Sequence, residues 1–142
     1  MTAESNKWIE AVARLIKLTN EGKIQWHTAK GKYSTVGIEN ADAAFIAQYK
    51  KKTLRIYRFL FKAEAPPNLL SASAGVSIWD SYFSEKKYPY WEHRFILEFV
   101  NDEGQSLWKF PDMKPLMNDL YSSIQYMVAG VSDFLEDILK DE

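Results

Sequence analysis

The sequence predicts an α+β fold, in which an N-terminal helix precedes an antiparallel sheet of about four to six strands. One or two C-terminal helices are expected to pack on one face of that sheet. Two observations support this order: apolar residues recur at helical spacing near both ends of the chain, and they alternate with polar residues in the middle. With 142 residues, 46% of them apolar, the chain is expected to form a single domain over residues 1–142.

The first element is a predicted helix over residues 5–20. Its apolar residues run at helical spacing from Trp8 to Leu18, with Ser5 as a possible N-cap and Gly22 as a C-terminal stop. After Gly22 the period changes to two, because Ile24 and Trp26 alternate with polar residues, which is typical of a half-buried strand. Residues 30–40 are polar and indicate a loop or a weak strand.

Two hairpins follow along the chain. Alternating residues 45–49, a turn of three lysines at 50–52 and an aromatic-rich run at 54–61 predict the first hairpin. Residues 91–100 and 105–110 predict the second hairpin, with a polar turn at 101–104 that ends in Gly104. Between the hairpins, residues 63–90 show no sustained period. We expect a long aromatic-rich excursion there, which serves a function or contains a short element.

The C-terminal region predicts two helices. Pro111 and Pro115 mark the start of the first helix, whose apolar stripe extends to Val128. Gly130 interrupts the pattern, and Ser132 can cap a last helix with apolar residues on one side and acidic residues on the other. We interpret this helix as one that covers its own sheet, although docking on a partner or on a second copy would give the same pattern.

Three stretches carry a resemblance to known proteins: Leu18 to Trp26 (LTNEGKIQW), Leu97 to Trp108 (LEFVNDEGQSLW) and Ala129 to Leu135 (AGVSDFL). They resemble small stand-alone bacterial and phage cytosolic proteins of unassigned function, with a helix-GxIxW opening and a short acidic C-terminal helix. The resemblance covers both ends of the chain and the second hairpin, but not residues 63–90. It implies a fold and a bacterial or phage cytosolic origin, and it supplies no functional residue.

Composition excludes several classes of site. The absence of cysteine excludes disulfides, thiolate zinc sites, iron–sulfur clusters and a cysteine nucleophile, and it fits a reducing, cytoplasmic compartment. We expect no signal peptide and no membrane contact, because no long apolar run is present. A net charge of −1 makes nucleic acid an improbable partner. No metal-binding spacing and no nucleotide or hydrolase motif occurs, so no metal and no cofactor are predicted.

The first hairpin has a local excess of positive charge. Residues 43–63 contain six cations and no acidic residue, interleaved with aromatic residues. Arg55 and Tyr57 share one face of the predicted strand and Arg58 lies on the other, so these residues are candidates for binding phosphate and stacking a base. The alternative is that the lysines form a solvated turn that protects a sheet edge.

The aromatic cluster that follows supplies the other candidate residues. Trp79, Tyr82 and Trp91 can line a pocket or an interface, or they can simply cap the open end of the sheet. Arg94 adds a possible phosphate contact near Trp91. His93 lies between Glu92 and Arg94 and can act as a general acid or base, but its place beside Trp91 and Phe95 favours a structural, half-buried histidine.

The sequence therefore supports three hypotheses in decreasing order. The first is a non-catalytic protein-interaction module that binds a protein partner or a second copy of itself through the aromatic cluster and the basic hairpin. The second is a protein that binds or sequesters a small ligand, such as a nucleotide or another phosphorylated metabolite. The third is a small enzyme that uses His93 with Glu92 or Glu98. No catalytic residue is assigned under the first two.

Overall fold

The computed structural model describes residues 3–63 and 89–140, and their element order confirms the α+β prediction. Helix α1 (Ala3–Asn20) precedes strands β1 (His27–Thr28), β2 (Phe45–Tyr49), β3 (Lys52–Ala63), β4 (Tyr90–Val100) and β5 (Ser106–Lys109). A 3₁₀ turn, η1 (Gly31–Tyr33), lies between β1 and β2. Helices α4 (Lys114–Val128) and α5 (Val131–Lys140) complete the chain.

The five strands form one sheet in sequence order, β1-β2-β3-β4-β5, with antiparallel pairing of β1 with β2, β2 with β3 and β4 with β5. By contacts between Cα atoms the chain divides into two units. One unit consists of residues 1–59 and 95–142, and the other of residues 60–94, so that β3 and β4 each run from one unit into the other. The predicted excursion at 63–90 lies outside the described residues, apart from residues 63, 89 and 90.

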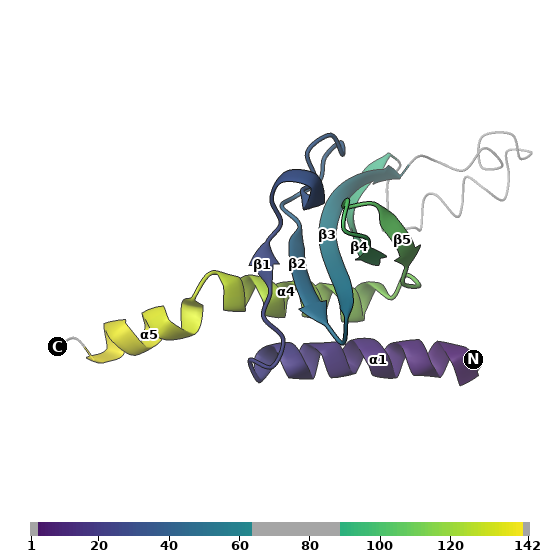
Figure 1. Ribbon diagram of the computed structural model, residues 1–142. Coiled ribbons are helices and arrows are strands. Elements are labelled where there is room, and N and C mark those ends of the chain that lie inside the picture. The colour runs from purple at the N-terminus through teal and green to yellow at the C-terminus, as the bar shows by residue number, and fades with distance from the viewer. Residues whose placement is uncertain (1–2, 64–88, 141–142) are drawn as a thin grey trace, which may run out of the picture. The chain divides into compact units, whose positions relative to one another are not determined.

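Helices α1 and α4 pack together and cover one face of the sheet (Figure 1). Alternate residues of β3, including Leu54 and Ile56, point into this core because side chains of a strand alternate between its faces. The buried residues of this core come from both helices and from β2, β3, β4 and the segment before β1: Val12, Leu15, Ile24, Trp26, Phe45, Ala47, Leu54, Ile56, Phe95, Leu97, Met117, Leu120, Tyr121 and Ile124.

The end of α1 is fixed by a buried hydrogen bond that the alternation of residues 24–27 did not reveal. The indole Nε1 of Trp26 donates to Thr19 Oγ1 over 3.0 Å, and Gly22 takes a positive φ of 74° where the chain leaves the helix. Ile24 and Trp26 are buried as the alternation predicts. Regular strand pairing, however, is limited to His27 and Thr28.

Residues 29–44, which include the loop or weak strand predicted over residues 30–40, cover the second face of the sheet. Ala29, Ala44 and Tyr57 form a small second core there, with Phe59 and Ile96 packed against it. Because both faces of β3 are covered, its residues 54–57 are all buried and the strand shows no simple alternation of burial.

The last helix differs from its predicted placement. α4 buries Met117, Leu120, Tyr121 and Ile124, whereas α5 buries no residue at all within the described part of the chain. Gly130, with a φ of 68°, separates the two helices, and Figure 1 shows α5 continuing away from the end of α4. The interpretation that α5 covers its own sheet is therefore wrong. None of the described helices is long and apolar enough to cross a membrane.

Candidate functional site

An apolar groove lies between α1 and the sheet. Figure 1 shows the β2–β3 turn beside α1 in this region. The groove encloses about 480 Å³. Its lining comes from α1, from the first hairpin and from the aromatic residues of the second hairpin: Trp8, Ala11, Arg14, Leu15, Leu18, Tyr49, Lys50, Lys52, Leu54, Phe99 and Phe110. Most of this lining is apolar, so the groove is suited to an apolar side chain.

Aromatic rings form one end of the groove. Trp8 of α1 stacks on Trp108 of β5, with ring centroids 4.8 Å apart, and meets the edge of Phe110 at 5.1 Å. Phe99 of β4 packs on Phe110 at 5.3 Å. Trp8 and Phe99 are only half-buried, and Trp108 is 43% exposed. This end of the core is therefore accessible to a binding partner, and aromatic residues of this kind are enriched where partners bind.

Three cations border the apolar lining. Arg14 lies on the α1 side of the groove and forms an exposed ion pair with Glu10, in which its Nη2 is 3.9 Å from Glu10 Oε1. Lys50 and Lys52 stand on the hairpin side, and neither forms an ion pair with any residue that the structure describes. The Lys52 Nζ lies 5.8 Å from the centroid of the Phe99 ring. Positive charge therefore lies on both sides of the groove.

The turn that carries these lysines has an unusual backbone. Tyr49 pairs with Lys52, so the hairpin loop has two residues, Lys50 and Lys51, and not the three predicted. Their φ values of 49° and 66° are left-handed, as a tight two-residue hairpin loop requires, yet such loops favour Asn and Gly. Each left-handed non-glycine residue costs about 1 kcal/mol. The left-handed conformations of Lys50 and Lys51 therefore lower the stability of the fold.

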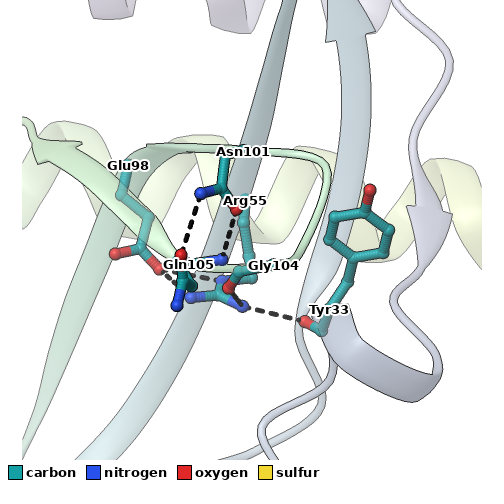
Figure 2. A network of polar contacts seen from close by, with 6 residues as sticks. All are labelled: Tyr33, Arg55, Glu98, Asn101, Gly104 and Gln105. Atoms are coloured by element: carbon teal, nitrogen blue, oxygen red, sulfur yellow. Dashed lines mark hydrogen bonds and ion pairs between the residues drawn. The ribbon is translucent and has the colours of Figure 1, made fainter.

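Arg55, a candidate for phosphate binding, serves the fold instead (Figure 2). Its guanidinium is buried and contacts Glu98 Oε2 through Nε at 2.8 Å and through Nη2 at 2.6 Å. Its Nη1 donates to the carbonyl oxygens of Tyr33 at 3.2 Å and of Gly104 at 3.1 Å. These bonds join β3 to β4, to η1 and to the turn before β5, and they leave the cation enclosed by protein.

The turn before β5 is built around this ion pair. Asn101 Oδ1 accepts hydrogen bonds from the backbone N–H groups of Glu103 and Gln105, both at 2.9 Å. Gly104 has a φ of 81°, and a Cβ atom there would collide with the carbonyl group of Lys32. Glu98, Asn101 and Gly104 all belong to the stretch LEFVNDEG, which therefore holds Arg55 in place.

The other two candidates on β3 also have partners. Tyr57 is buried in the second core, where burial, followed by the charge of Glu98, raises the pKa of its hydroxyl above 10.0 although Arg55 opposes this. Arg58 forms an ion pair with Asp42 at 2.6 Å, and its guanidinium lies 5.0 Å from the Tyr121 ring centroid. Arg55 and Arg58 lie on opposite faces of the sheet, so they do not form one phosphate site.

Trp91 and Arg94 lie in the second unit. Trp91 is 53% exposed, with Lys62 Nζ 6.0 Å from its ring centroid. The Arg94 guanidinium lies 3.8 Å from the Phe61 ring centroid and 3.5 Å from Glu92 Oε1. Trp79 and Tyr82, the other candidates of the aromatic cluster, lie outside the described residues.

His93 is exposed, contrary to the expectation that it is half-buried. Glu98, one of its two suggested partners, is only 1% exposed and is bonded to Arg55, so it is not available to His93. Nowhere in residues 3–63 and 89–140 do three or more metal-binding side chains of the His, Cys, Asp or Glu type come together.

The cation-rich hairpin predicted at residues 43–63 includes the two rim lysines, Lys50 and Lys52, although neither is among the predicted site residues. Trp8 fits the apolar stripe predicted for the first helix and Phe110 ends a predicted strand, so the sequence pattern does not mark the aromatic end of the groove. Comparison with protein-family models, with curated proteins and with solved structures found no match.

Proposed function

We propose that this protein is a non-catalytic protein-interaction module whose groove binds an apolar, acidic segment of a protein. The observation that carries the proposal is the composition of the groove, which combines an apolar floor with cations on both sides. An amphipathic helix that lays its apolar face into such a groove can place carboxylates against those cations. Complementary charge then adds orientation and selectivity to apolar burial.

Two further observations support binding rather than catalysis. Among the described residues, no His, Asp, Glu, Ser, Thr or Cys side chain lines the groove, and its charged side chains are all cations. Arg55 and Glu98, which are buried charged groups, are bonded to each other on the opposite face of the sheet. The lining of the groove is therefore better suited to recognition of an acidic, apolar segment than to acid–base catalysis.

The test is a titration of the protein with three synthetic helical peptides, followed by NMR of the Trp8 indole and of the Lys52 amide. The first peptide is amphipathic and acidic, the second replaces its acids with lysines, and the third replaces its apolar residues with serines. We expect only the first to shift both signals. A protein that responds equally to all three, or to none, contradicts the proposal.

Two double variants make this test specific to the groove. Lys50→Glu with Lys52→Glu reverses the rim charges and should weaken binding of the acidic peptide at least about tenfold. Lys23→Glu with Lys30→Glu changes the net charge equally at exposed positions outside the groove, and should leave binding within about twofold. Equal loss in both double variants would assign the effect to general charge.

A second candidate is an amphipathic small anion. The volume of the groove, about 480 Å³, lies in the range of small-ligand sites. The apolar lining favours a ligand with a hydrocarbon body and one negative group over a nucleotide. Displacement of a bound short-chain carboxylate by the acidic peptide, followed in the same NMR titration, distinguishes the two candidates by their relative affinities.

A further inference from the structure

The apolar face of α5 has no cover within the described part of the chain. Phe134, Leu135, Ile138 and Leu139 are 62%, 44%, 53% and 79% exposed. At the helical spacing of 3.6 residues per turn these four side chains form one stripe. Four large apolar side chains on a single exposed helix face are typical of a surface that binds another protein.

Acidic residues border this stripe on both sides. On a helical projection Asp137 lies next to one border of the stripe, and Glu136 lies next to the other. The groove has the complementary arrangement, with Arg14 on its α1 side and Lys50 and Lys52 on its hairpin side. The helix thus offers an apolar face with an acid on each border, and the groove offers an apolar floor with a cation on each side.

α5 does not occupy the groove of its own chain, since none of its residues lines the groove. The aromatic end of the groove includes Phe110, shortly before α4 begins, whereas α5 follows the other end of α4. The 15 residues of α4 separate these ends by about 22 Å at 1.5 Å per residue. Figure 1 shows α5 directed away from the N-terminal end of α1.

We infer that α5 of one copy occupies the groove of a second copy. This inference rests on the proposed function, because it identifies the acidic, apolar segment that the groove binds. Each copy carries one helix and one groove on different parts of its surface. Two copies can exchange their helices and form a closed dimer, whereas one-way contacts would continue as a head-to-tail chain. The β2–β3 turn, with its two left-handed lysines, then lies beside the acidic border of the incoming helix.

The experiment is sedimentation velocity of the full chain from about 1 µM to about 1 mM. A ten-residue helix buries less than the standard interface of about 1,600 Å², so we expect weak association, with a dissociation constant well above about 1 µM. The helix variant, Leu135→Asp with Ile138→Asp, and the groove variant, Lys50→Glu with Lys52→Glu, should each weaken association at least about tenfold. The Lys23→Glu and Lys30→Glu control should associate as the wild type does.

Mixing the two defective variants gives the decisive result. The helix variant keeps an intact groove and the groove variant keeps an intact α5, so a one-to-one mixture should form a heterodimer with a single contact. Neither variant alone should do so. Circular dichroism and the urea midpoint of each variant, measured near 1 µM, establish that it is folded.

A second rescue tests the charges. Glu136→Lys with Asp137→Lys, added in trans or in the same chain, should restore binding to the groove variant when Arg14→Glu reverses the α1 side of the groove as well. A wild-type chain that stays monomeric up to about 1 mM overturns the inference. So does association that survives both variants, or a mixture that forms no heterodimer. If the acidic peptide still binds in those cases, the proposed function stands without this occupant, and if it does not, both fail.

Discussion

Helices α1 and α5 have the same sequence pattern but opposite surroundings. Both place apolar residues on one side and charged residues on the other. In α1 that side is covered by the sheet and by α4, so Val12 is 0% exposed and Leu15 is 8% exposed. In α5 the corresponding side is open, with Leu135 44% exposed. The pattern therefore predicts that a face will be covered, but not by which molecule.

The largest expected difference comes from placing one carboxyl on each apolar face. Val12→Asp buries a polar group without a partner, and it should lower the free energy of unfolding by more than about 4 kcal/mol. Leu135→Asp should change it by less than about 0.5 kcal/mol. Urea denaturation at about 1 µM protein, where the chain is expected to be monomeric, measures both. Similar losses would show that α5 is part of the folded core.

Removing one carboxylate from each region should give the next largest difference. Glu98→Ala leaves the buried Arg55 guanidinium without its counter-ion and should cost about 3 kcal/mol. Glu136→Ala removes an exposed charge of α5 and should cost less than about 0.5 kcal/mol. The same urea titrations measure both variants. A small loss for Glu98→Ala would mean that solvent reaches Arg55.

Two glycine substitutions compare the cost of adding a Cβ atom in the turn before β5 with its cost before α5. Gly104→Ala introduces a Cβ atom that collides with Lys32 and also disfavours the positive φ, and we expect a loss of about 2 kcal/mol. Gly130→Ala, before α5, has the positive φ but nothing within 4 Å, so about 1 kcal/mol is expected. Thermal unfolding followed by circular dichroism measures this difference. Equal losses would indicate that the turn at Gly104 adjusts.

Substitutions in the β2–β3 turn should change the stability of the fold and the strength of self-association in opposite directions. Lys50→Asn with Lys51→Gly gives the two-residue loop its preferred residues, so it should stabilise the fold by about 1 kcal/mol. The same variant removes positive charge facing α5 and should weaken self-association severalfold. The urea midpoint and sedimentation are therefore expected to move in opposite directions. Weaker folding together with weaker association would point to a structural role for the lysines.

The smallest expected effect is a dependence on alkaline pH. The pKa of Tyr57 is raised mainly by burial, so the fold favours its neutral form. This contribution is complete below the unfolded value of about 10 and is lost as the pH rises through the folded pKa. Tyr57→Phe should therefore lose less stability than the wild type between about pH 9 and about pH 11. Tyr126→Phe, at an exposed position, should follow the wild type.

The regular elements could be predicted from the sequence because each depends on local periodicity. The hairpins, α1, α4 and α5 all begin and end within a few residues of the predicted positions. The cover formed by residues 29–44 could not be predicted, since its packing depends on small residues such as Ala29 and Ala44 that show no period. The same limit hid the two-residue loop, because Lys50 to Lys52 look alike in sequence.

The candidate site was predictable only in part for a related reason. Lys52 and Arg55 both appear as cations of one hairpin, yet Lys52 borders the groove and Arg55 is buried against Glu98. Only tertiary structure brings Glu98 to Arg55, or Phe110 to Trp8. Whether a cationic side chain is exposed or buried thus depends on contacts between residues that are distant in the sequence.

The edges of the sheet have a consequence for the solubility of the chain. At one edge β1 has two residues, and at the other β5 has four exposed residues that include Lys109. Short edge strands present few unpaired backbone groups of their own to a foreign strand, which disfavours strand addition at these positions. In a chain with 46% apolar residues, we therefore expect copies to associate through side chains rather than by adding strands.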